Sequence, residues 1–538
     1  MLRVEPRDYS RLIAPLFRTG RGFWITIAIL SVVVAVGVVM YVRQLIVGLE
    51  VTGLQRPGYW GLYMVNFIFL IGVSMAGTLV SASLYLLGAN WRRPITRIAE
   101  TVTVFGLLIA ALQIVFDMGR PDRTWMLLQY GRLQSPLLWD MTSLSTYILV
   151  SMFALYTSIL PDFGILRDNY PDDGPAWRRY LYTILALGWR GNREQWLRLE
   201  KTMKIVSILI IPIGVSLHTV TAWIFSTTVQ PGWHSTILGP YFVVGAVFSG
   251  IALLFMLLVA MRRLYHLEHY IGAAQYRNLG VILIVMSIVW FYFTYTEHLV
   301  QVAGQGKDEF PVLASKLWGA DAPAFWAMVI LMIIAAWILI VPKIIPQRWE
   351  GLAFFQLRVP LTSSALAAVV LGLIAINRYD PAILFVDADA IFSPFTWEGI
   401  LVTVFWLLAG LAVFTSLPWL KQHMVAGTVF ASGCIVAGMW LERWNILVPT
   451  LSHPYLIEWT SYFPTLTEWI LVLASFALFA LLFLVFFQLF PPISIWEVSE
   501  GRVIERAESK VEIPMPQPSL PERERRRMPR MGRLMRES

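Results

Sequence analysis

The chain has 538 residues, of which 57% are hydrophobic and only 14% are charged, and its formal net charge is +8. With a mean hydropathy of +0.64, the apolar surface exceeds what a soluble core can bury. The composition therefore excludes a large soluble protein and favours an integral membrane protein. The single cysteine, Cys434, excludes an internal disulfide, a cysteine-ligated zinc site and a self-contained iron–sulfur cluster, because each needs several thiolates.

Apolar runs long enough to cross a bilayer recur along the chain. A hydrocarbon core of about 30 Å needs roughly 20 consecutive apolar residues in a helix. Residues 1–22 are polar and arginine-rich, and the first run behind them is too long for a signal-peptide core, so we expect a retained first helix. The predicted spans are Phe23–Val47, Tyr59–Gly88, Ile95–Phe116, Leu137–Leu160, Met203–Thr228, Gly239–Met261, Leu279–Val302, Pro323–Val341, Trp397–Leu417, His423–Leu441 and Phe463–Phe490.

One further run, Leu361–Ile376, is short and can either span with tilt or be re-entrant. The pattern therefore predicts an all-α fold, a polytopic transmembrane bundle of about twelve helices, or about eleven if this run does not span.

The loops carry unequal positive charge. If Leu361–Ile376 spans, the basic segments all fall on one side: the N-terminus, the Trp91–Arg93 turn, residues 161–200, 262–277 and 343–358, and the C-terminal tail. Positively charged loops resist translocation. We therefore expect a multi-pass protein of the cytoplasmic (inner) membrane with both termini in the cytoplasm. The twelve-helix count is favoured because eleven helices would place the arginine-rich tail outside.

The spans and loops divide the chain into four expected regions. Residues 1–22 form a basic cytoplasmic N-terminus, 23–228 hold the first helices and a first bundle, and 239–490 hold a second bundle and additional helices. Residues 491–538 mix Pro, Glu and Arg with few large apolar residues, a composition that cannot bury enough surface to fold alone. We expect this last region to be a disordered cytoplasmic tail.

Four ionisable residues fall in the outer half of the predicted membrane region. Asp117 and Arg120 end the third span, Asp140 lies about one turn inside the fourth, and His218 lies past the middle of the fifth. Because charges in a bilayer are costly, each is a functional candidate. A carboxylate beside a histidine suits quinol oxidation, which needs hydrogen bonds to two hydroxyls and proton acceptors.

Each of these residues also has a structural interpretation. Asp140 can be a solvated helix-end residue, His218 a histidine packed against a neighbouring helix, and Asp117 and Arg120 a pair that ties down a loop.

Four more charged residues are candidates for a proton path: Glu100, Glu297, Glu442 and Arg443. For Glu100, solvation at the interface is the alternative, and an adjacent Glu442 and Arg443 can lower their cost of burial by pairing. Among the seven histidines only His218 lies deep in a span. We therefore expect no bis-histidine haem and no metal site in this chain.

Three short motifs, in order, resemble the polysulfide-reductase (NrfD-like) family of quinone-reactive membrane subunits. They are Tyr59–Tyr63 (YWGLY), Asp117–Pro121 (DMGRP) and Ser135–Asp140 (SPLLWD). The stretch around His218, then Pro231–Thr236, Pro240–Phe242 and Met439–Arg443, is more narrowly similar to the larger quinol-binding subunit of alternative complex III. The similarity covers roughly residues 20–345 and 420–490.

The resemblance implies two four-helix bundles as core, no haem, and a menaquinol site near the outer surface beside an iron–sulfur partner subunit. It also implies a second NrfD-like membrane subunit and electron transfer to cytochrome c subunits. Asp117, Arg120, Asp140 and His218 match the family's candidate positions, and Tyr63 and Trp139 lie in the motifs as further quinol-binding candidates. An extra helix pair at about 361–417 and the long basic tail depart from the family.

The resulting hypothesis is a quinol-oxidising membrane subunit of a respiratory or photosynthetic electron-transfer complex, with no redox cofactor of its own. Coupling to proton translocation, the quinone and the terminal acceptor stay open. Two similar polar-aromatic segments, Asn377–Pro381 (NRYDP) and Glu442–Ile446 (ERWNI), each end an apolar run and suggest a weak internal duplication. A secondary transporter is the main rival, because about twelve helices with a weak duplication also describe transporters. The membrane anchor of a polysulfide or other reductase is another, as is a purely structural anchor. No nucleic-acid partner is expected.

Overall fold

The computed structural model describes residues 9–344, isolated residues between 400 and 420, and residues 421–508, apart from 14–15, 17–18, 57, 171–173, 305 and 456–457. Ten described helices are long and apolar enough to cross a membrane, so the predicted all-α polytopic class is confirmed. Each coincides with one predicted span. The predicted span Leu361–Ile376 and most of Trp397–Leu417 lie outside the described residues.

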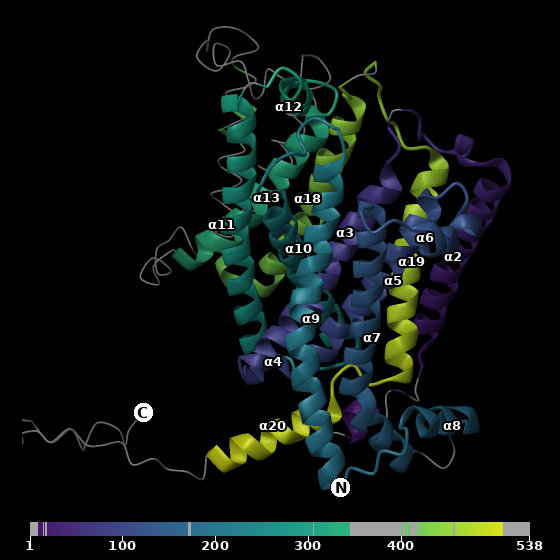
Figure 1. The fold of residues 1–538 in the computed structure, drawn as a ribbon. Helices are drawn as coiled ribbons and strands as arrows, with labels where there is room; N and C mark the ends of the chain where they lie inside the picture. Colours follow the sequence, from purple (N-terminus) through teal and green to yellow (C-terminus); the bar gives the residue numbers. More distant parts are fainter. Residues whose placement is uncertain are drawn as a thin grey trace, which may run out of the picture.

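The long helices alternate with short helical segments, most of which lie near the ends of the molecule (Figure 1). The long ones are α2 (Arg21–Val47), α3 (Leu62–Gly77), α5 (Thr96–Asp117), α7 (Pro136–Asp168), α9 (Arg193–Thr227), α10 (Leu238–Leu264), α11 (Ala273–Gly304), α13 (Ala322–Ile344), α18 (Met424–Ser452) and α19 (Leu466–Leu489). The short ones are η1 (Tyr9–Ile13), η3 (Leu49–Val51), η4 (Thr78–Ser83), α4 (Leu84–Leu86), η5 (Asn90–Arg92), η6 (Pro121–Arg123), α6 (Trp125–Tyr130), α8 (Ala176–Leu185), α12 (Phe310–Leu317) and α20 (Ile495–Glu508). Two of them, η4 and α4, continue α3 within the span Leu62–Leu86.

The long helices pack as two bundles of four with an additional pair at one side. Helices α3, α5, α7 and α9 form the first bundle, and α10, α11, α13 and α18 form the second. Helices α2 and α19 pack together, and α19 contacts α5 (Figure 1). The two four-helix bundles that the sequence predicted are therefore present.

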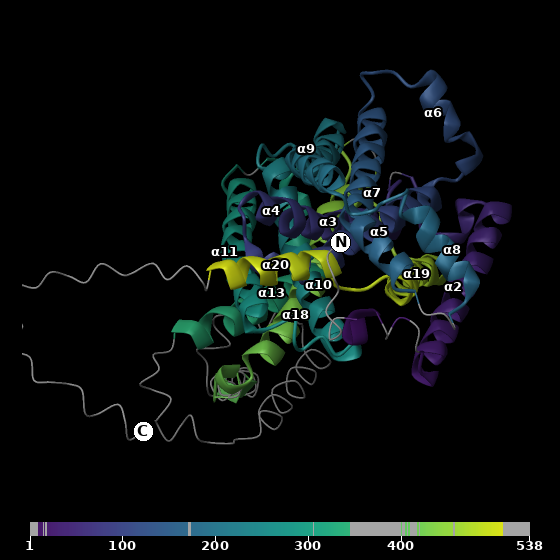
Figure 2. The same cartoon turned by 90° about the horizontal axis from the view of Figure 1, so that it is seen from below.

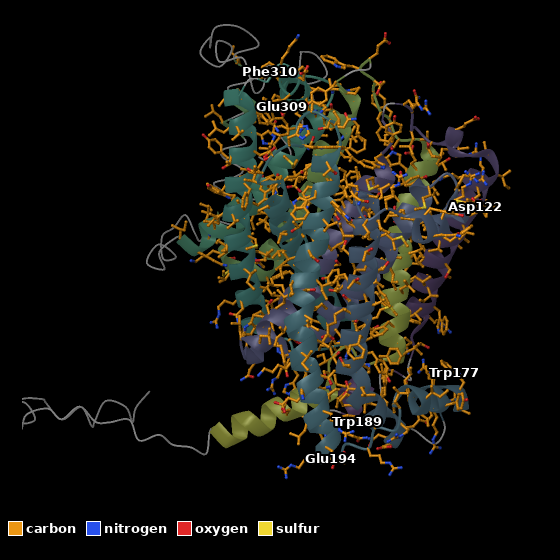
Figure 3. The ribbon with its side chains drawn as sticks, in the orientation of Figure 1. Asp122, Trp177, Trp189, Glu194, Glu309 and Phe310 are labelled. Carbon is orange, nitrogen blue, oxygen red and sulfur yellow. The ribbon has the colours of Figure 1, made fainter. Side chains whose placement is uncertain are left out.

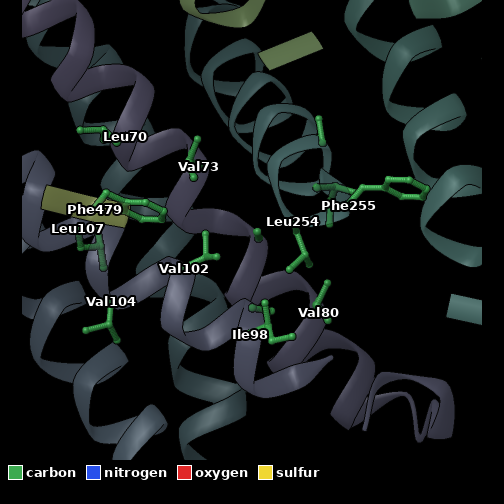
Figure 4. Close-up of a cluster of buried hydrophobic side chains, with 14 of the residues drawn as sticks. Leu70, Val73, Val80, Ile98, Val102, Val104, Leu107, Leu254, Phe255 and Phe479 are labelled. Carbon is green, nitrogen blue, oxygen red and sulfur yellow. The ribbon is translucent and has the colours of Figure 1, made fainter. Parts of the chain in front are cut away.

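Small residues join the two bundles. Gly72 and Ala76 on α3 face Ala246 and Gly250 on α10, and a Cβ atom added at Gly250 would lie 2.9 Å from the Val73 carbonyl oxygen. Spacing small residues four apart lets helix backbones approach closely in a membrane. Around this contact, α3, α5, α10 and α19 bury a shared apolar core (Figure 4). The core includes Leu70, Val73, Val102, Leu254, Phe255 and Phe479.

Local sequence signals fix several helix ends. Asn192 caps α9, accepting a hydrogen bond from the Gln195 N–H at 2.9 Å. Thr465 and Glu468 form a capping box at the start of α19. Gly48 ends α2 with φ at +96°, a conformation that favours glycine.

The two ends of the molecule differ in charge. One, the basic end, carries η5, α8 and the last turn of α10, with the arginine pairs Arg92–Arg93, Arg178–Arg179 and Arg262–Arg263. The other, the opposite end, carries η6, α6 and α12 (Figure 1). Figure 3 shows Trp189 and Glu194 at the basic end and Glu309 and Phe310 at the opposite end.

The tail boundary expected at residue 491 is too early. Helix α20 spans Ile495–Glu508, and seen from below it lies across the basic end of the molecule (Figure 2). Ile495 and Trp496 are buried. Composition alone missed this helix because it has few apolar side chains, and Ile495 and Trp496 are buried only through contacts with residues far away in the sequence.

Candidate quinol site and its buried polar network

Asp140 is a buried carboxylate near the opposite end of the first bundle. Pro136 starts α7 at a position that needs no backbone N–H donor, which places Asp140 about one turn inside the helix. The Thr221 hydroxyl on α9 donates a hydrogen bond of 2.9 Å to Asp140 Oδ1, and Asp140 is 8% exposed. A hydroxyl partner satisfies the carboxylate without neutralising it.

His218 lies one turn before Thr221 on α9 and is buried against α3. Its Nδ1 atom is 2.8 Å from the Gly214 carbonyl oxygen, and its Nε2 atom is 3.1 Å from the Ile71 carbonyl oxygen. Carbonyl oxygens only accept hydrogen bonds, and a neutral imidazole can donate only one. A proton added to His218 therefore finds an acceptor already in place.

Asp117 ends α5 at the same end of the molecule, among a different set of side chains. Its Oδ1 atom is buried without a hydrogen-bond partner among the described residues. Tyr63, on α3, donates 2.8 Å to Gln44 Oε1, and Gln44 Nε2 donates 2.7 Å to the Phe116 carbonyl oxygen. A polar network of α2, α3 and α5 thus surrounds the end of α5.

Glu468 extends this network, and the sequence did not indicate it as a site residue. It interacts electrostatically with Tyr63 and Asp117. The Tyr462 hydroxyl donates 2.5 Å to Glu468 Oε1 and accepts 2.8 Å from the Leu62 N–H. Burial, and then the Glu468 charge, raise the pKa of the Tyr462 phenol above its usual value. The T-x-x-E capping pattern was a readable signal, but it indicated only a helix start.

The side chains of Arg120 and Trp139 both bind residues of the loop between α5 and α7. The Arg120 guanidinium pairs with Asp122 at 2.9 Å, and its side chain is 63% exposed. This differs from the pairing with Asp117 that the sequence left open, because the tight η6 turn brings Asp122 closer. The Trp139 indole N–H donates 2.5 Å to the Leu133 carbonyl oxygen, so this ring ties the loop to the start of α7.

In the second bundle, Glu442 and Arg443 are buried on α18 and form an ion pair of 2.9 Å. The predicted pairing of these two charges is therefore confirmed. The Trp290 indole donates 2.8 Å to Glu442 Oε1, and the Arg443 guanidinium lies 4.9 Å from the centre of the Phe242 ring. Arg443 also interacts electrostatically with His218. A positive charge in the second bundle therefore influences a titratable residue in the first bundle.

A cavity of about 30 Å³ lies beside Glu442, lined also by Glu297, His298, Lys316 and Asn445. This volume is enough for about one water molecule. Glu297 accepts hydrogen bonds from the Ser235 hydroxyl at 2.5 Å and from Gln301 at 3.2 Å. Burial lowers the pKa of the Lys316 ammonium group to about 8, although the charges of Glu297 and Asp321 oppose this shift. Lys316 lies on the short helix α12, where no sequence pattern indicated a buried charge.

Glu100 occupies a separate position toward the basic end, between α5, η4 and α7. The Ser81 and Ser158 hydroxyls donate hydrogen bonds to its two carboxylate oxygens at 2.5 Å and 2.6 Å. Glu100 is 7% exposed, so it is a buried residue rather than a solvated interfacial one.

The structure thus brings the predicted residues together in part. Asp140 on α7 is bonded to Thr221 on α9, three residues after His218, but the His218 ring contacts carbonyls of α9 and α3 instead. Asp117 and Tyr63 interact electrostatically with Glu468. The partners Thr221, Glu468 and Lys316 were missed, although Thr221 is three residues after His218 and so lies on the same helix face.

Comparisons with known proteins give the chain its relatives. It is 29% identical over 254 residues to a protein of Halobacterium salinarum named as a candidate membrane subunit of dimethyl sulfoxide reductase, covering 45% of this chain and 52% of that protein. It is 28% identical over 236 residues to a selenate reductase subunit of Mesobacillus selenatarsenatis, covering 43% and 54%. The Hdr-like menaquinol oxidoreductase integral membrane subunit of Archaeoglobus fulgidus is 23% identical over 278 residues, covering 52% and 60%.

The chain therefore spans between 52% and 60% of the length of these relatives. A family model described as polysulphide reductase, NrfD, matches residues 50–373, which include the whole first bundle and most of the residues discussed above. The chain is a multi-pass membrane protein that belongs to the NrfD polysulphide reductase family.

Proposed function

We propose that this chain is the quinol-oxidising membrane subunit of a respiratory or photosynthetic electron-transfer complex, with menaquinol as its substrate. The observation that carries the proposal is the buried Asp140 carboxylate, bound by Thr221 on a helix that also carries buried His218. Ionisable groups inside a membrane are retained where they bind substrates or move protons.

Quinol oxidation releases two protons and two electrons, and leaves a quinone. In the proposed reaction, Asp140 and His218 hold the quinol hydroxyls and take up the protons as the electrons leave. The electrons pass to an iron–sulfur partner subunit that docks on the opposite end, which we assign to the outer face. His218 is suited to the uptake of a proton because, once protonated, both of its ring N–H groups face a carbonyl acceptor. To bind a quinol hydroxyl, the ring must turn away from one of these carbonyls.

Asp117, Arg120, Tyr63 and Trp139 complete the proposed site. Asp117 offers an unpartnered buried carboxylate oxygen among the described residues, and Tyr63 a phenol hydroxyl. Arg120 lies on the loop between α5 and α7, Trp139 lies in the first turn of α7, and both would border the entry of the pocket. They are bound to Asp122 and Leu133, so their contribution is to shape the loop.

We propose Glu100, Glu297, Glu442 and Arg443 as members of a proton path through the chain, separate from Asp140 and His218, which take up the protons of the quinol. Three of them border the small internal cavities of the two bundles, where single water molecules fit between fixed polar groups. Arg443 is adjacent to Glu442 and is electrostatically coupled to His218. In this proposal it connects the part of the proton path in the second bundle with the part in the first.

The proposed complex contains an iron–sulfur subunit, a second NrfD-like membrane subunit and cytochrome c subunits, with both termini of this chain in the cytoplasm. The printed name of the Archaeoglobus relative, a menaquinol oxidoreductase subunit, supports the substrate. The names of two other relatives, subunits of dimethyl sulfoxide and selenate reductases, support a second candidate. In that case the subunit oxidises quinol to feed electrons to a reductase rather than to cytochrome c.

Substitution of Asp140 tests the site. Asp140→Asn keeps the shape and the Thr221 contact but removes the proton acceptor, so quinol oxidation by the assembled complex should fall by about 10²-fold. The matched control is Asp308→Asn, a change at an exposed aspartate of the same end, which should leave turnover unchanged. Co-purification of the subunits verifies assembly. Unchanged quinol oxidation in an assembled Asp140→Asn complex would place the site elsewhere.

A further inference from the structure

A small cavity lies inside the first bundle, on the side of the basic end. It has a volume of about 30 Å³, which is enough for about one water molecule. Most of its polar lining consists of hydroxyl groups around a single carboxylate. These residues are Thr78, Ser81, Glu100, Thr103, Ser151, Thr157, Ser158 and Ser207.

Glu100 is the acid of this cavity. Among the described residues no ion pair includes it, since the nearby Arg97 guanidinium pairs with buried Asp162 at 2.6 Å. Two serine hydroxyls hold it instead. A carboxylate buried without a cation is costly to keep charged, and such groups inside membranes mark proton relays.

The backbone of the α3 segment is shaped around this cavity. Thr78–Ser83 form a π-helical segment between α3 and α4, which turns the Thr78 and Ser81 side chains toward the cavity. Gly77 just before it lets α5 approach closely, because an added Cβ atom would lie 2.5 Å from the Ala99 carbonyl oxygen. Single π-turns inside helices occur frequently at functional sites.

A larger vestibule of about 490 Å³ opens at the basic end next to the cavity. It is lined by η5, the start of α9 and the first turns of α20, including Asn90, Arg93, Glu200, Trp496 and Glu500. Tyr85, Arg92 and Met203 line both spaces. These three side chains therefore form the wall between the vestibule and the cavity.

The first residues of α20 bind Arg92, which belongs to this wall, and the neighbouring helix α7. Glu497 pairs with Arg92 at 3.2 Å, with the two side chains 2% and 9% exposed. Asp162 accepts hydrogen bonds from the Ile495 and Trp496 N–H groups, each 3.2 Å. The Trp496 indole donates 2.9 Å to the carbonyl oxygen of Ser158, the residue whose hydroxyl holds Glu100.

We propose that the vestibule and the cavity form one aqueous inlet that delivers protons from the basic end to Glu100, and that the Arg92–Glu497 pair is its gate. While Arg92 is paired with Glu497, its guanidinium group closes the passage between the vestibule and the cavity. When the pair breaks, water from the vestibule reaches the Glu100 carboxylate. In this step a proton passes from water to a Glu100 oxygen, and no electron moves. The inlet does not depend on which substrate the first bundle binds.

Beyond Glu100 the hydroxyl groups continue toward His218. Thr78 hydrogen-bonds the Tyr147 hydroxyl, and the Tyr147 ring packs against Gly214, with an added Cβ there lying 3.3 Å from it. Gly214 is the residue whose carbonyl oxygen faces His218 Nδ1. The inlet therefore points along the first bundle toward the proposed site.

Thiol labelling tests the inlet directly, because Cys434 is the only cysteine of the chain. The experiment uses sealed membranes that hold the full complex, in a Cys434→Ala background. Ser207→Cys places a thiol on the cavity wall, and Ser432→Cys places one on α18, also buried and outside the inlet. The probe is the silver ion Ag⁺, which binds thiolates, does not cross the bilayer and is about as small as the single water molecule that the cavity holds. Thiols left unreacted are counted with maleimide after denaturation. An exposed Glu194→Cys variant identifies membranes whose basic end faces the reagent.

Ser207→Cys should react faster than Ser432→Cys, and only when the basic end faces the reagent. Adding Glu497→Gln should raise that rate by about tenfold or more, since losing one partner of a buried ion pair destabilises the closed arrangement by more than the ~1.4 kcal/mol that tenfold represents. Glu500→Gln, the same change one turn along α20, should not. Equal rates for Ser207→Cys and Ser432→Cys, reaction from the opposite side, or no effect of Glu497→Gln would overturn the inlet.

The Glu100 carboxyl group supplies a second readout. Its C=O infrared band, identified by its loss in Glu100→Gln, should shift in D₂O, and Glu497→Gln should speed that exchange. A Glu100 band that exchanges at one rate with and without Glu497→Gln would exclude the gate. Both measurements are independent of quinol oxidation, so their failure is distinguishable from failure of the proposed function.

Discussion

Hydroxyl groups hold several of the buried carboxylates in this molecule. Thr221 binds Asp140, Ser81 binds Glu100, and Ser235 binds Glu297. A hydroxyl donates one hydrogen bond but brings no positive charge. These carboxylates are therefore held in position while remaining able to take up a proton. The acids that pair with arginine, such as Asp162 and Glu442, lie at contacts between helices.

Lys316 gives a prediction of pH-dependent stability. Its pKa is lowered to about 8 in the folded protein, against about 10.4 in an unfolded chain. Between these values the unfolded chain binds more protons, so stability rises with pH over this window. Wild-type stability relative to Lys316→Met should thus rise across that window, from about pH 8 to about pH 10.4, as measured by thermal unfolding in detergent. Lys307→Met, at an exposed lysine of the same end, should show no such trend. A flat difference for Lys316→Met would contradict this pKa.

Some of the buried charged residues, such as Asp140 and Glu442, could be selected from the sequence, because the cost of a charge in the bilayer depends on residue type and position in a span. Their partners could not. Asp140 and Thr221 are 81 residues apart, and only the packing of α7 on α9 brings them together. The same holds for Glu468, whose contact with Gly53 at 2.7 Å joins residues 415 positions apart.

At the scale of elements, the apolar runs predicted the ten described spans because hydrophobic length is a local property. Several helices extend further than the apolar runs, as in α9, which begins at Arg193 rather than Met203. Polar turns continue a helix beyond the bilayer when a cap such as Asn192 is available. The π-helical segment Thr78–Ser83 had no sequence signal, because it depends on the neighbouring helices.

The close contact of α3 with α5 predicts the effect of two glycine substitutions. Gly77→Ala places a Cβ atom 2.5 Å from the Ala99 carbonyl oxygen, so backbone must shift, and we expect a loss of about 1–3 kcal/mol. Gly433→Ala, in α18, meets nothing within 4 Å and should stabilise by about 0.5–1 kcal/mol through helix propensity. Reversible unfolding in mixed micelles measures both. Equal effects of the two changes would refute the close contact.

At the scale of the whole molecule, the position of the basic end predicts sidedness. In a Cys434→Ala background, a Glu194→Cys variant should react with an impermeant maleimide only from the cytoplasm, because loops rich in Lys and Arg stay there. A Lys307→Cys variant, exposed at the opposite end, should react only from outside. Labelling of both from the same side would mean that an even number of crossings separates the two positions.

The composition of the whole chain predicts its spectrum. With one cysteine and one histidine deep in a span, we expect the purified subunit to lack haem absorbance and an iron–sulfur signal. Redox difference spectroscopy and electron paramagnetic resonance of the isolated chain measure these. Bands of b-type haem in the purified subunit would show that the histidines near the helix ends act as ligands.

The seam of small residues between α3 and α10 constrains how this protein can move. A Cβ atom added at Gly250 would lie 2.9 Å from backbone atoms of both Val73 and Ala76. The backbones of α3 and α10 are therefore in direct contact there, with no flexible side chains between them that could rearrange as one helix slides past the other. Secondary transporters alternate access by rocking one half against the other, and halves fused at such a seam turn as one body. Any transport across this molecule must then proceed by small local rearrangements, such as one arginine changing partners, while the bundles themselves stay fixed.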